Sequence, residues 1–290
     1  MKKPVFTGVC TALVTPFWAN EVNYPLADVL LQRQMDAGIS AVVLAGTTGE
    51  APTLTDEEKL ALFARCKAYA GDACTIIAGT GSNCTAHAVE LSRAAETVGA
   101  DALLVVSPYY NKATPEGLIA HYLSVAEAVN IPVIIYNVPG RTCVDIPVSV
   151  YKRLSLHPNI VGVKEASADI TKITEIRSVC GDDFTIWSGN DDQIVPCAAM
   201  GGKGIISVLS NVIPLETKIM AEAALSGDFA TASKMQCQLC PLVKALFSEV
   251  NPIPVKAAMD ILGYDCGGCR LPLCDLSAER RELLKKLLQT

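Results

Sequence analysis

The sequence has no cluster of basic residues and no long apolar run. Among its 290 residues, Lys and Arg number 24 and Asp and Glu number 30, which gives a net charge of -6 at pH 7. Nucleic-acid binding relies on clustered cations that release counterions from phosphates, so we expect no nucleic-acid partner. Because no apolar run approaches the roughly 18 to 20 residues that cross a bilayer, we expect no membrane partner either.

The first residues lack the marks of a secretory signal. The stretch MKKPVFTGVCTALVTPF carries two lysines and a short apolar run, but Pro16 interrupts the run. No small-residue cleavage site follows a true signal core. We interpret this stretch as the first strand of the fold and expect a cytoplasmic protein.

The twelve cysteines run from Cys10 to Cys274, mostly inside apolar patterns. They are typical of small buried side chains in a reducing cytosol. Two pairs leave alternatives open: CQLC (237–240) and CGGC (266–269) together have the spacing of a four-thiolate zinc site, and CGGC also that of a disulfide or redox pair. Because Cys237 and Cys240 lie in a stretch with the apolar spacing of an ordinary amphipathic helix, we expect no metal.

Short β-type apolar runs alternate with helical stretches of about a dozen residues, a pattern typical of βα units and a parallel sheet. Eight units favour a closed barrel over an open doubly wound sheet. We therefore predict an α/β fold, a (β/α)8 TIM barrel over residues 1–226, with a C-terminal extension of three helices over residues 227–290. The eight runs are GVCTALV (8–14), AVVLAG (41–46), CTIIAG (74–79), ALLVVS (102–107), PVIIYN (132–137), IVGVKE (160–165), FTIWSG (184–189) and GIISV (204–208).

Barrel enzymes place their chemistry where the strands end. The predicted strand ends gather hydroxyls, phenols, an arginine and a lysine, and no group of His and carboxylates suited to a catalytic metal. This set indicates carbonyl chemistry without metal or cofactor. The strand ends are GTTGE (46–50), GTGSN (79–83), SPYYN (107–111), YNVPGR (136–141), Lys164 and SGND (188–191).

Lys164 ends a run that includes Ile160, Val161 and Val163. Burial among such side chains lowers the pKa of a lysine, and the neutral amine that results can form a Schiff base with a ketone. The alternative is a lysine whose ammonium reaches solvent from a strand end, which is common.

Four more residues at these ends suit such a reaction, and each has a structural alternative. Tyr136 can shuttle protons, or it is a core tyrosine bonded to backbone. Thr47 and Thr48 lie in a glycine-flanked turn that can bind a carboxylate, or that serves as an ordinary strand-to-helix turn. Arg141 follows Pro-Gly and can clamp a carboxylate with two hydrogen bonds, or it lies on the surface.

Nine stretches, in order and with matching spacing over nearly the whole chain, resemble the dihydrodipicolinate synthase family of the pyruvate-dependent class I aldolase superfamily. The doublet Thr47-Thr48 together with NVPGR favours this family over its relatives. The resemblance implies condensation of pyruvate with L-aspartate 4-semialdehyde, on the path to diaminopimelate and lysine. The stretches are FTGVCTALVTPF, GTTGEAPTL, IAGTGSN, SPYYNKATPEGL, IIYNVPGRT, GVKEAS, SGNDDQ, GGKGIISV and NPIPVK.

The resemblance also implies roles for the catalytic residues. Lys164 would form the imine with pyruvate, and Thr48 would help to hold the pyruvate carboxylate. Tyr136 would be the central proton donor and acceptor. Thr47 would link Tyr136 to Tyr110, which in the family reaches in from the neighbouring subunit, so we expect a homo-oligomer built as a dimer of dimers.

Arg141 would bind the carboxylate of the aldehyde, and Gly189 and Ile206 would shape the wall near the imine. Two alternatives remain. A sister aldolase would cleave N-acetylneuraminate or a 2-keto-3-deoxy sugar acid, which needs hydrogen-bonding groups where the synthase needs one cation. A catalytically silent barrel would only bind a ligand or a partner.

The resemblance further points to an effector site for lysine. Sensitive members place a glutamate where this chain has His87, so the acidic partner for the ligand's ammonium groups is missing. Lys59 replaces a histidine and adds a positive charge, which opposes a ligand with two ammonium groups, although Asp56 would compensate in part. We predict weak sensitivity or none. The matching positions are Ala51, Pro52, Asp56, Lys59, Asn83, His87 and Tyr109.

Overall fold

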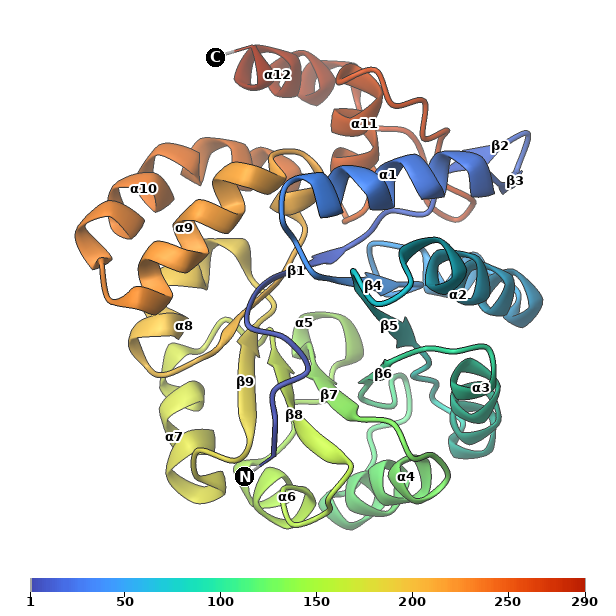
Figure 1. The fold of residues 1–290 in the computed structure, drawn as a ribbon, viewed down its shortest axis with the longest axis vertical. Coiled ribbons are helices and arrows are strands. Elements are labelled where there is room, and N and C mark those ends of the chain that lie inside the picture. Colours follow the sequence, from blue (N-terminus) through green and yellow to red (C-terminus); the bar gives the residue numbers. More distant parts are fainter. Residues whose placement is uncertain (1, 290) are drawn as a thin grey trace.

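The eight β-type runs form eight parallel strands that close into a barrel, in the computed structural model that describes residues 2–289 (Figure 1). The strands meet in the order β1, β10, β9, β8, β7, β6, β5 and β4, and β4 pairs with β1 to close the barrel. The predicted (β/α)8 TIM barrel is confirmed. The barrel strands are β1 Gly8–Ala12, β4 Ala41–Leu44, β5 Thr75–Gly79, β6 Ala102–Val106, β7 Val133–Asn137, β8 Ile160–Glu165, β9 Thr185–Ser188 and β10 Gly204–Ser207.

Helices surround this barrel, and a two-stranded hairpin, β2 Phe17–Trp18 and β3 Glu21–Val22, follows β1. Thr55 caps α2 as a capping box, since its hydroxyl accepts from the Glu58 amide at 3.2 Å and Glu58 accepts from the Thr55 amide at 2.9 Å. The helices are α1 Tyr24–Asp36, α2 Asp56–Ala70, α3 Thr85–Thr97, α4 Pro115–Glu127, α5 Pro139–Thr142, α6 Val148–Leu154, α7 Ile170–Cys180, α8 Ile194–Ala199 and α9 Pro214–Ser226, with 3-10 turns η1 Ala51–Thr53, η2 Asp191–Gln193 and η3 Leu209–Asn211.

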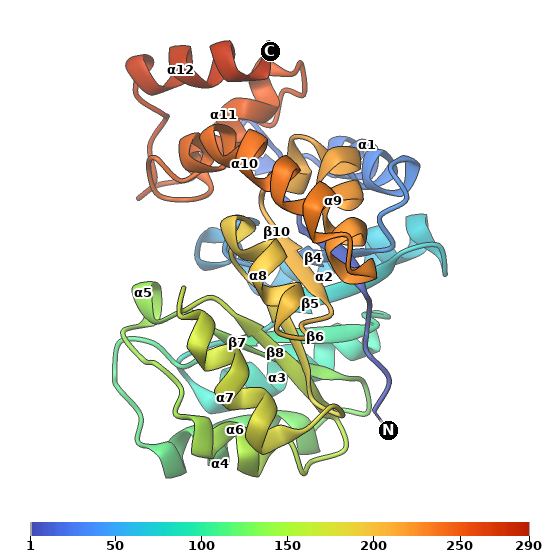
Figure 2. The same cartoon turned by 90° about the vertical axis from the view of Figure 1, so that its left-hand side faces the viewer.

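Three helices follow the barrel, as predicted: α10 Phe229–Leu246, α11 Ile253–Ile261 and α12 Ala278–Leu288. Figure 2 shows them stacked at one end of the molecule, and Figure 1 places α11 beside α1. The expected boundary between residues 226 and 227 falls in the turn between α9 and α10. That the two parts are separate domains stays a prediction.

Strand β8 carries an irregularity that decides where Lys164 points. Val133 pairs with Ile160, but the next residue, Ile134, pairs with Gly162, so Val161 is an extra residue in β8. A bulge of this kind reverses the side-chain alternation beyond it. Without it, Lys164 would share the outer face with Ile160; with it, Lys164 pairs with Tyr136 on the inner face.

The cysteines correct one expectation. All twelve are free, and only five are buried, whereas the apolar patterns predicted burial for most of them. Cys237 lies exposed on α10, because helical spacing turns its side chain away from the core. The buried ones are Cys10, Cys66, Cys74, Cys197 and Cys266.

No helix formed by residues 2–289 combines the length and the apolar character needed to span a membrane.

Candidate active site

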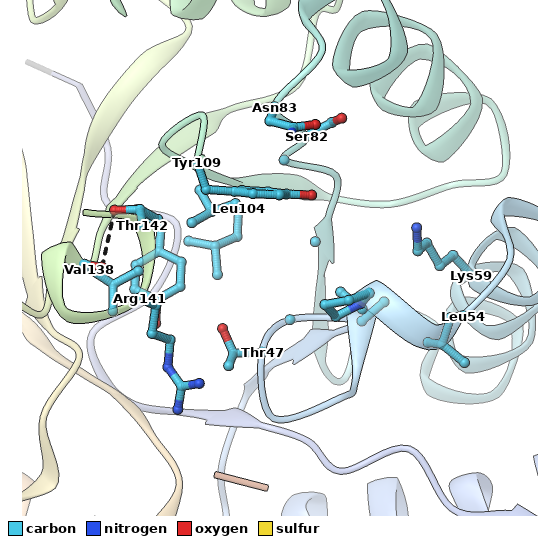
Figure 3. A pocket seen from close by; sticks show the side chains of 18 of the residues that line it. Thr47, Leu54, Lys59, Ser82, Asn83, Leu104, Tyr109, Val138, Arg141 and Thr142 are labelled. Atoms are coloured by element: carbon cyan, nitrogen blue, oxygen red, sulfur yellow. Dashed lines mark hydrogen bonds between the residues drawn. The ribbon is translucent and has the colours of Figure 1, made fainter. Parts of the chain in front are cut away.

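The carboxyl ends of β4, β5, β6 and β7 open into a cavity of about 570 Å³. Thr47 and Arg141 line one part of it, and Lys59, Ser82 and Asn83 line another (Figure 3). Tyr136 also lines the cavity. The cavity therefore joins the predicted substrate site to the predicted effector positions within one chain.

Lys164 lies at the carboxyl end of β8, between Tyr136 on β7 and Trp187 on β9. Its side chain is almost fully buried, at 5% exposure, and its ammonium nitrogen lies 4.3 Å from the centre of the Tyr136 ring. Tyr136 is itself 6% exposed and lines the cavity. The structure thus brings together the predicted nucleophile and the predicted proton carrier.

Lys164 differs from the other buried lysines in the described part of the chain. Lys59, Lys172 and Lys256 each have a carboxylate oxygen within ion-pair distance. Lys164 has no such ion pair among residues 2–289. A buried charge is costly unless it is paired. Lys164 therefore does not serve as the counter-charge of a carboxylate, and its amine is left available for chemistry.

Gly189 and Ile206 are the two residues predicted to shape the wall near the imine, and Gly189 lies beside Lys164. A Cβ atom added to Gly189 would lie 2.7 Å from the Ala166 Cβ and 3.0 Å from the Lys164 Cε, so the glycine leaves room for the lysine side chain. Ile206 is fully buried in the inner barrel cluster that also contains Tyr136. That these two residues shape the wall near the imine stays a prediction.

The predicted threonine turn connects β4 to η1. Its backbone closes on itself, because the Glu50 amide donates to the Thr47 carbonyl and the Ala51 amide donates to the Gly46 carbonyl, both at 3.1 Å. Thr47 lines the cavity, and Thr48 is 2% exposed.

Arg141 lies on the short helix α5, which begins with Pro139. The residue is solvent-exposed, yet its guanidinium group lines the cavity and donates to the Asn251 carbonyl at 3.4 Å. Because the guanidinium has five N–H donors, most remain available to an anionic substrate.

Tyr110, another predicted catalytic residue, does not line the cavity. It is 86% exposed and has a positive φ of 76°, in the turn that follows β6. A bulky residue in the left-handed region is uncommon and costs energy. The turn therefore presents the phenol outward at an energetic cost.

Sequence reasoning missed Asn251, which precedes α11. Its side-chain nitrogen donates to the Thr48 hydroxyl at 3.0 Å, and its side-chain oxygen is buried without a hydrogen-bond partner among the described residues. The stretch NPIPVK carried this residue, but its contact with a turn 203 positions away has no local signal.

Asp191 was also missed, although it belongs to the strand-end stretch SGND. It is 1% exposed and accepts hydrogen bonds from the Ser207 hydroxyl at 2.6 Å and from the Val208 and Leu209 amides at 3.0 Å. Burial raises its pKa, while these bonds and the charge of Lys164 act to lower it. Asp191 thus supplies a buried acidic group in the electrostatic range of Lys164.

The other part of the cavity contains a compact charged cluster. Asp56 accepts from Lys59 at 3.1 Å and lies 2.6 Å from His87, whose other ring nitrogen lies 3.2 Å from the Ser82 hydroxyl. Partial burial acts to raise the pKa of Asp56, but hydrogen bonds from His87 and Lys59 hold it below its usual value. The only carboxylate of this cluster is therefore already engaged.

Within residues 2–289, no group of three or more His, Cys, Asp or Glu side chains is arranged to hold a metal ion.

Known proteins resemble this chain over its whole length. The model of the dihydrodipicolinate synthetase family matches residues 5–290. A 4-hydroxy-tetrahydrodipicolinate synthase of Acetivibrio thermocellus is 48% identical over 289 residues, which cover 100% of this chain and 98% of the relative. The crystal structure of dihydrodipicolinate synthase from Aquifex aeolicus is 44% identical, with a TM-score of 0.96, and covers 98% of this chain and 97% of its own. The chloride-inhibited dihydrodipicolinate synthase from Acinetobacter baumannii, solved in complex with pyruvate, is 39% identical, with a TM-score of 0.95 and 98% of each chain covered.

Proposed function

The chain belongs to the dihydrodipicolinate synthetase family, and on that premise we propose that it is a lyase that condenses pyruvate with L-aspartate 4-semialdehyde to give 4-hydroxy-tetrahydrodipicolinate. This reaction serves diaminopimelate and lysine biosynthesis. A relative of known structure carries pyruvate, which supports the first substrate. The family match favours this reaction over cleavage of N-acetylneuraminate or a 2-keto-3-deoxy sugar acid.

One observation carries the proposal: Lys164 is buried beside Tyr136, which lines the cavity, and has no ion pair within the described chain. In the proposed reaction its amine attacks the pyruvate ketone, and loss of water gives an imine. The imine draws electrons from the pyruvate methyl group, which loses a proton and becomes the enamine carbon nucleophile. Tyr136 is placed to carry protons in these steps.

The second half of the reaction uses the other residues of the proposed site. The enamine carbon attacks the aldehyde carbon of the second substrate, whose carboxylate is held by Arg141 through paired charge-assisted hydrogen bonds. The amino group of that substrate then attacks the imine carbon, which closes the ring and frees Lys164. Thr48 holds the pyruvate carboxylate, while Gly189 and Ile206 leave space for the imine.

Completion of the site by Tyr110 belongs to the same proposal. Its outward position and strained backbone support a role in a neighbouring subunit, where it would meet Thr47. We therefore propose a homo-oligomer, a dimer of dimers, located in the cytoplasm. Twelve free cysteines agree with a reducing compartment.

Initial rates with the two proposed substrates test this function, followed by detection of the cyclic product. We expect turnover that requires both pyruvate and L-aspartate 4-semialdehyde, and no comparable release of pyruvate from N-acetylneuraminate or 2-keto-3-deoxygluconate. Faster cleavage of either sugar acid would contradict the proposal and favour the sister aldolase.

A further inference from the structure

The C-terminal extension contacts the catalytic threonine turn at two points. Asn251, just before α11, donates to the Thr48 hydroxyl at 3.0 Å. Lys256, within α11, donates to the Glu50 carboxylate at 2.8 Å. Since Thr48 and Glu50 are two residues apart in one turn, Asn251 and Lys256 together hold both the hydroxyl of the turn and its end.

The Glu50–Lys256 pair is enclosed on all sides. The two side chains are 0% and 2% exposed, respectively. The second Glu50 oxygen accepts from the Arg270 amide at 2.9 Å, and Lys256 also donates to the Gly268 carbonyl at 2.8 Å and lies 4.2 Å from the centre of the Phe17 ring. Both charges are therefore satisfied by partners from the extension and from the β2 hairpin.

The backbone of Glu50 explains why such a hold is needed. Glu50 has a φ of 57° and a ψ of 39°, in the left-handed region that a non-glycine residue adopts at an energetic cost. Such a conformation persists only when its surroundings over-determine it. The amide of the same residue closes the turn by donating to the Thr47 carbonyl, so a relaxed Glu50 would displace the threonines.

The stability of a fold does not in general require a buried ion pair. Well-packed apolar residues of similar volume often replace a buried ion pair at no loss of stability. What an ion pair with two further hydrogen bonds adds is a fixed position for the group that it holds. Here that group is the turn that carries Thr47 and Thr48.

We infer that Glu50 is a positioning residue for pyruvate, held by Lys256 from the C-terminal extension. The inference rests on the proposed function, because Thr48 is assigned to the pyruvate carboxylate. The extension is then a part of the catalytic apparatus, acting through the turn and not through contact with substrate.

Two variants and a control test this role. Glu50→Gln removes the negative charge with little change of shape. It leaves the Lys256 ammonium buried without a carboxylate, which would impair folding, so the double variant Glu50→Gln, Lys256→Met removes that ammonium as well. The control is Leu284→Ala, which opens a cavity under the fully buried Leu284 of α12, away from the turn. Each is compared with the parent by melting temperature, by the pyruvate dependence of borohydride trapping, and by amide exchange over residues 47–51.

In both Glu50 variants we expect the half-saturating pyruvate concentration for trapping to rise about tenfold. Amide exchange in the turn becomes faster by about tenfold or more, while the half-saturating aldehyde concentration changes less than about twofold. The control Leu284→Ala should have a lower melting temperature than the parent and the same pyruvate dependence.

Parent-like pyruvate dependence in the folded double variant would overturn the inference. An equal rise of the half-saturating pyruvate concentration in Leu284→Ala would also overturn it, and so would failure of both Glu50 variants to fold. Either result would mean that the ion pair serves stability alone. If the parent protein itself is not trapped by pyruvate, the proposed function fails instead, which keeps the two failures distinct.

Discussion

Two buried lysines differ in what surrounds them: Lys59 lines the cavity, and Lys164 lies beside Tyr136, which also lines it. Lys164 is 5% exposed, has the ring of Tyr136 beside it and has no ion pair among the described residues. Lys59 is 8% exposed and lies 3.1 Å from the carboxylate of Asp56, which also contacts His87. A lysine held by a carboxylate keeps its proton and serves as a cation, whereas a nucleophilic lysine must lose it.

The comparison teaches that burial alone does not identify a catalytic lysine. Four lysines are buried in residues 2–289, and three of them neutralise a carboxylate. The distinguishing features of Lys164 are its missing counter-charge and its position on the inner face of the barrel, which depends on the extra residue Val161 in β8.

Replacing the two lysines one at a time tests this difference most strongly. We expect Lys164→Ala and Lys164→Arg to lower kcat by more than about a thousandfold, because alanine has no amine and arginine stays protonated. Lys59→Met should change kcat by less than about threefold. Steady-state rates of folded variants, checked by circular dichroism, measure both. Near-parental turnover in Lys164→Arg would break the comparison.

Arg141→Ala separates the two substrates within the catalytic part. The aldehyde loses its carboxylate partner, so we expect kcat/KM for the aldehyde to fall by about 10- to 100-fold, the usual range for a hydrogen bond to a charged group. Trapping of pyruvate should persist, with the same half-saturating pyruvate concentration as in the parent protein. An equal loss of pyruvate trapping would show that Arg141 has been assigned to the wrong substrate.

The outward position of Tyr110 predicts that one chain alone is incomplete. We expect Tyr110→Phe to lower kcat about tenfold or more, because a proton-carrying hydroxyl is lost. Dilution until subunits separate should lower the specific activity in the same direction. A folded monomer with full specific activity, measured at a mass confirmed by light scattering, would rule out this role.

At the Lys59 end, we expect less than about twofold inhibition by L-lysine at millimolar concentrations and saturating pyruvate. Asp56 is already engaged by Lys59 and His87, so little acidic charge remains for a ligand with two ammonium groups. His87→Glu should increase inhibition, because it adds a carboxylate there. Strong cooperative inhibition of the parent protein below the millimolar range is the outcome that this account excludes.

The smallest effect concerns pH. The pKa of Asp56 in the folded protein lies below its ordinary value of 3.8, because hydrogen bonds from His87 and Lys59 outweigh the opposing effect of partial burial. A lowered folded pKa gives stability that is present above the unfolded pKa and is lost as the pH falls through the folded pKa. At neutral pH the parent should therefore be more stable than Asp56→Asn. This difference in the free energy of unfolding, measured by urea unfolding, should shrink as the pH is lowered below about 4. If the difference in the free energy of unfolding stayed constant from neutral pH to acid, the lowered pKa of Asp56 would not be its cause.

Local patterns were sufficient for most of the fold. The eight strands and the three C-terminal helices follow from short-range periodicity and end signals. The sequence could predict that Lys164 and Tyr136 lie close together because strand ends of a barrel converge, and the two side chains are indeed neighbours. The cysteine pattern misled, since an apolar neighbourhood in sequence does not say which way a helical side chain faces.

The rest depended on contacts between distant parts of the chain. Asn251 reaches Thr48 across 203 positions, and Lys256 reaches Glu50 across 206. No periodicity encodes such pairs. The bulge at Val161 is likewise set by pairing with the neighbouring strand, so the sequence predicted a lysine at the strand end but not the face to which it points.

The central claim is that Lys164 alone carries the imine, and borohydride trapping followed by peptide mass mapping tests it directly. The protein is incubated with pyruvate, reduced, digested and mapped, with Lys164→Ala and Lys59→Met treated in parallel. The account predicts one reduced pyruvate adduct per chain, on Lys164, present in Lys59→Met and missing from Lys164→Ala. An adduct on any other residue, or no adduct in the parent protein, would contradict it.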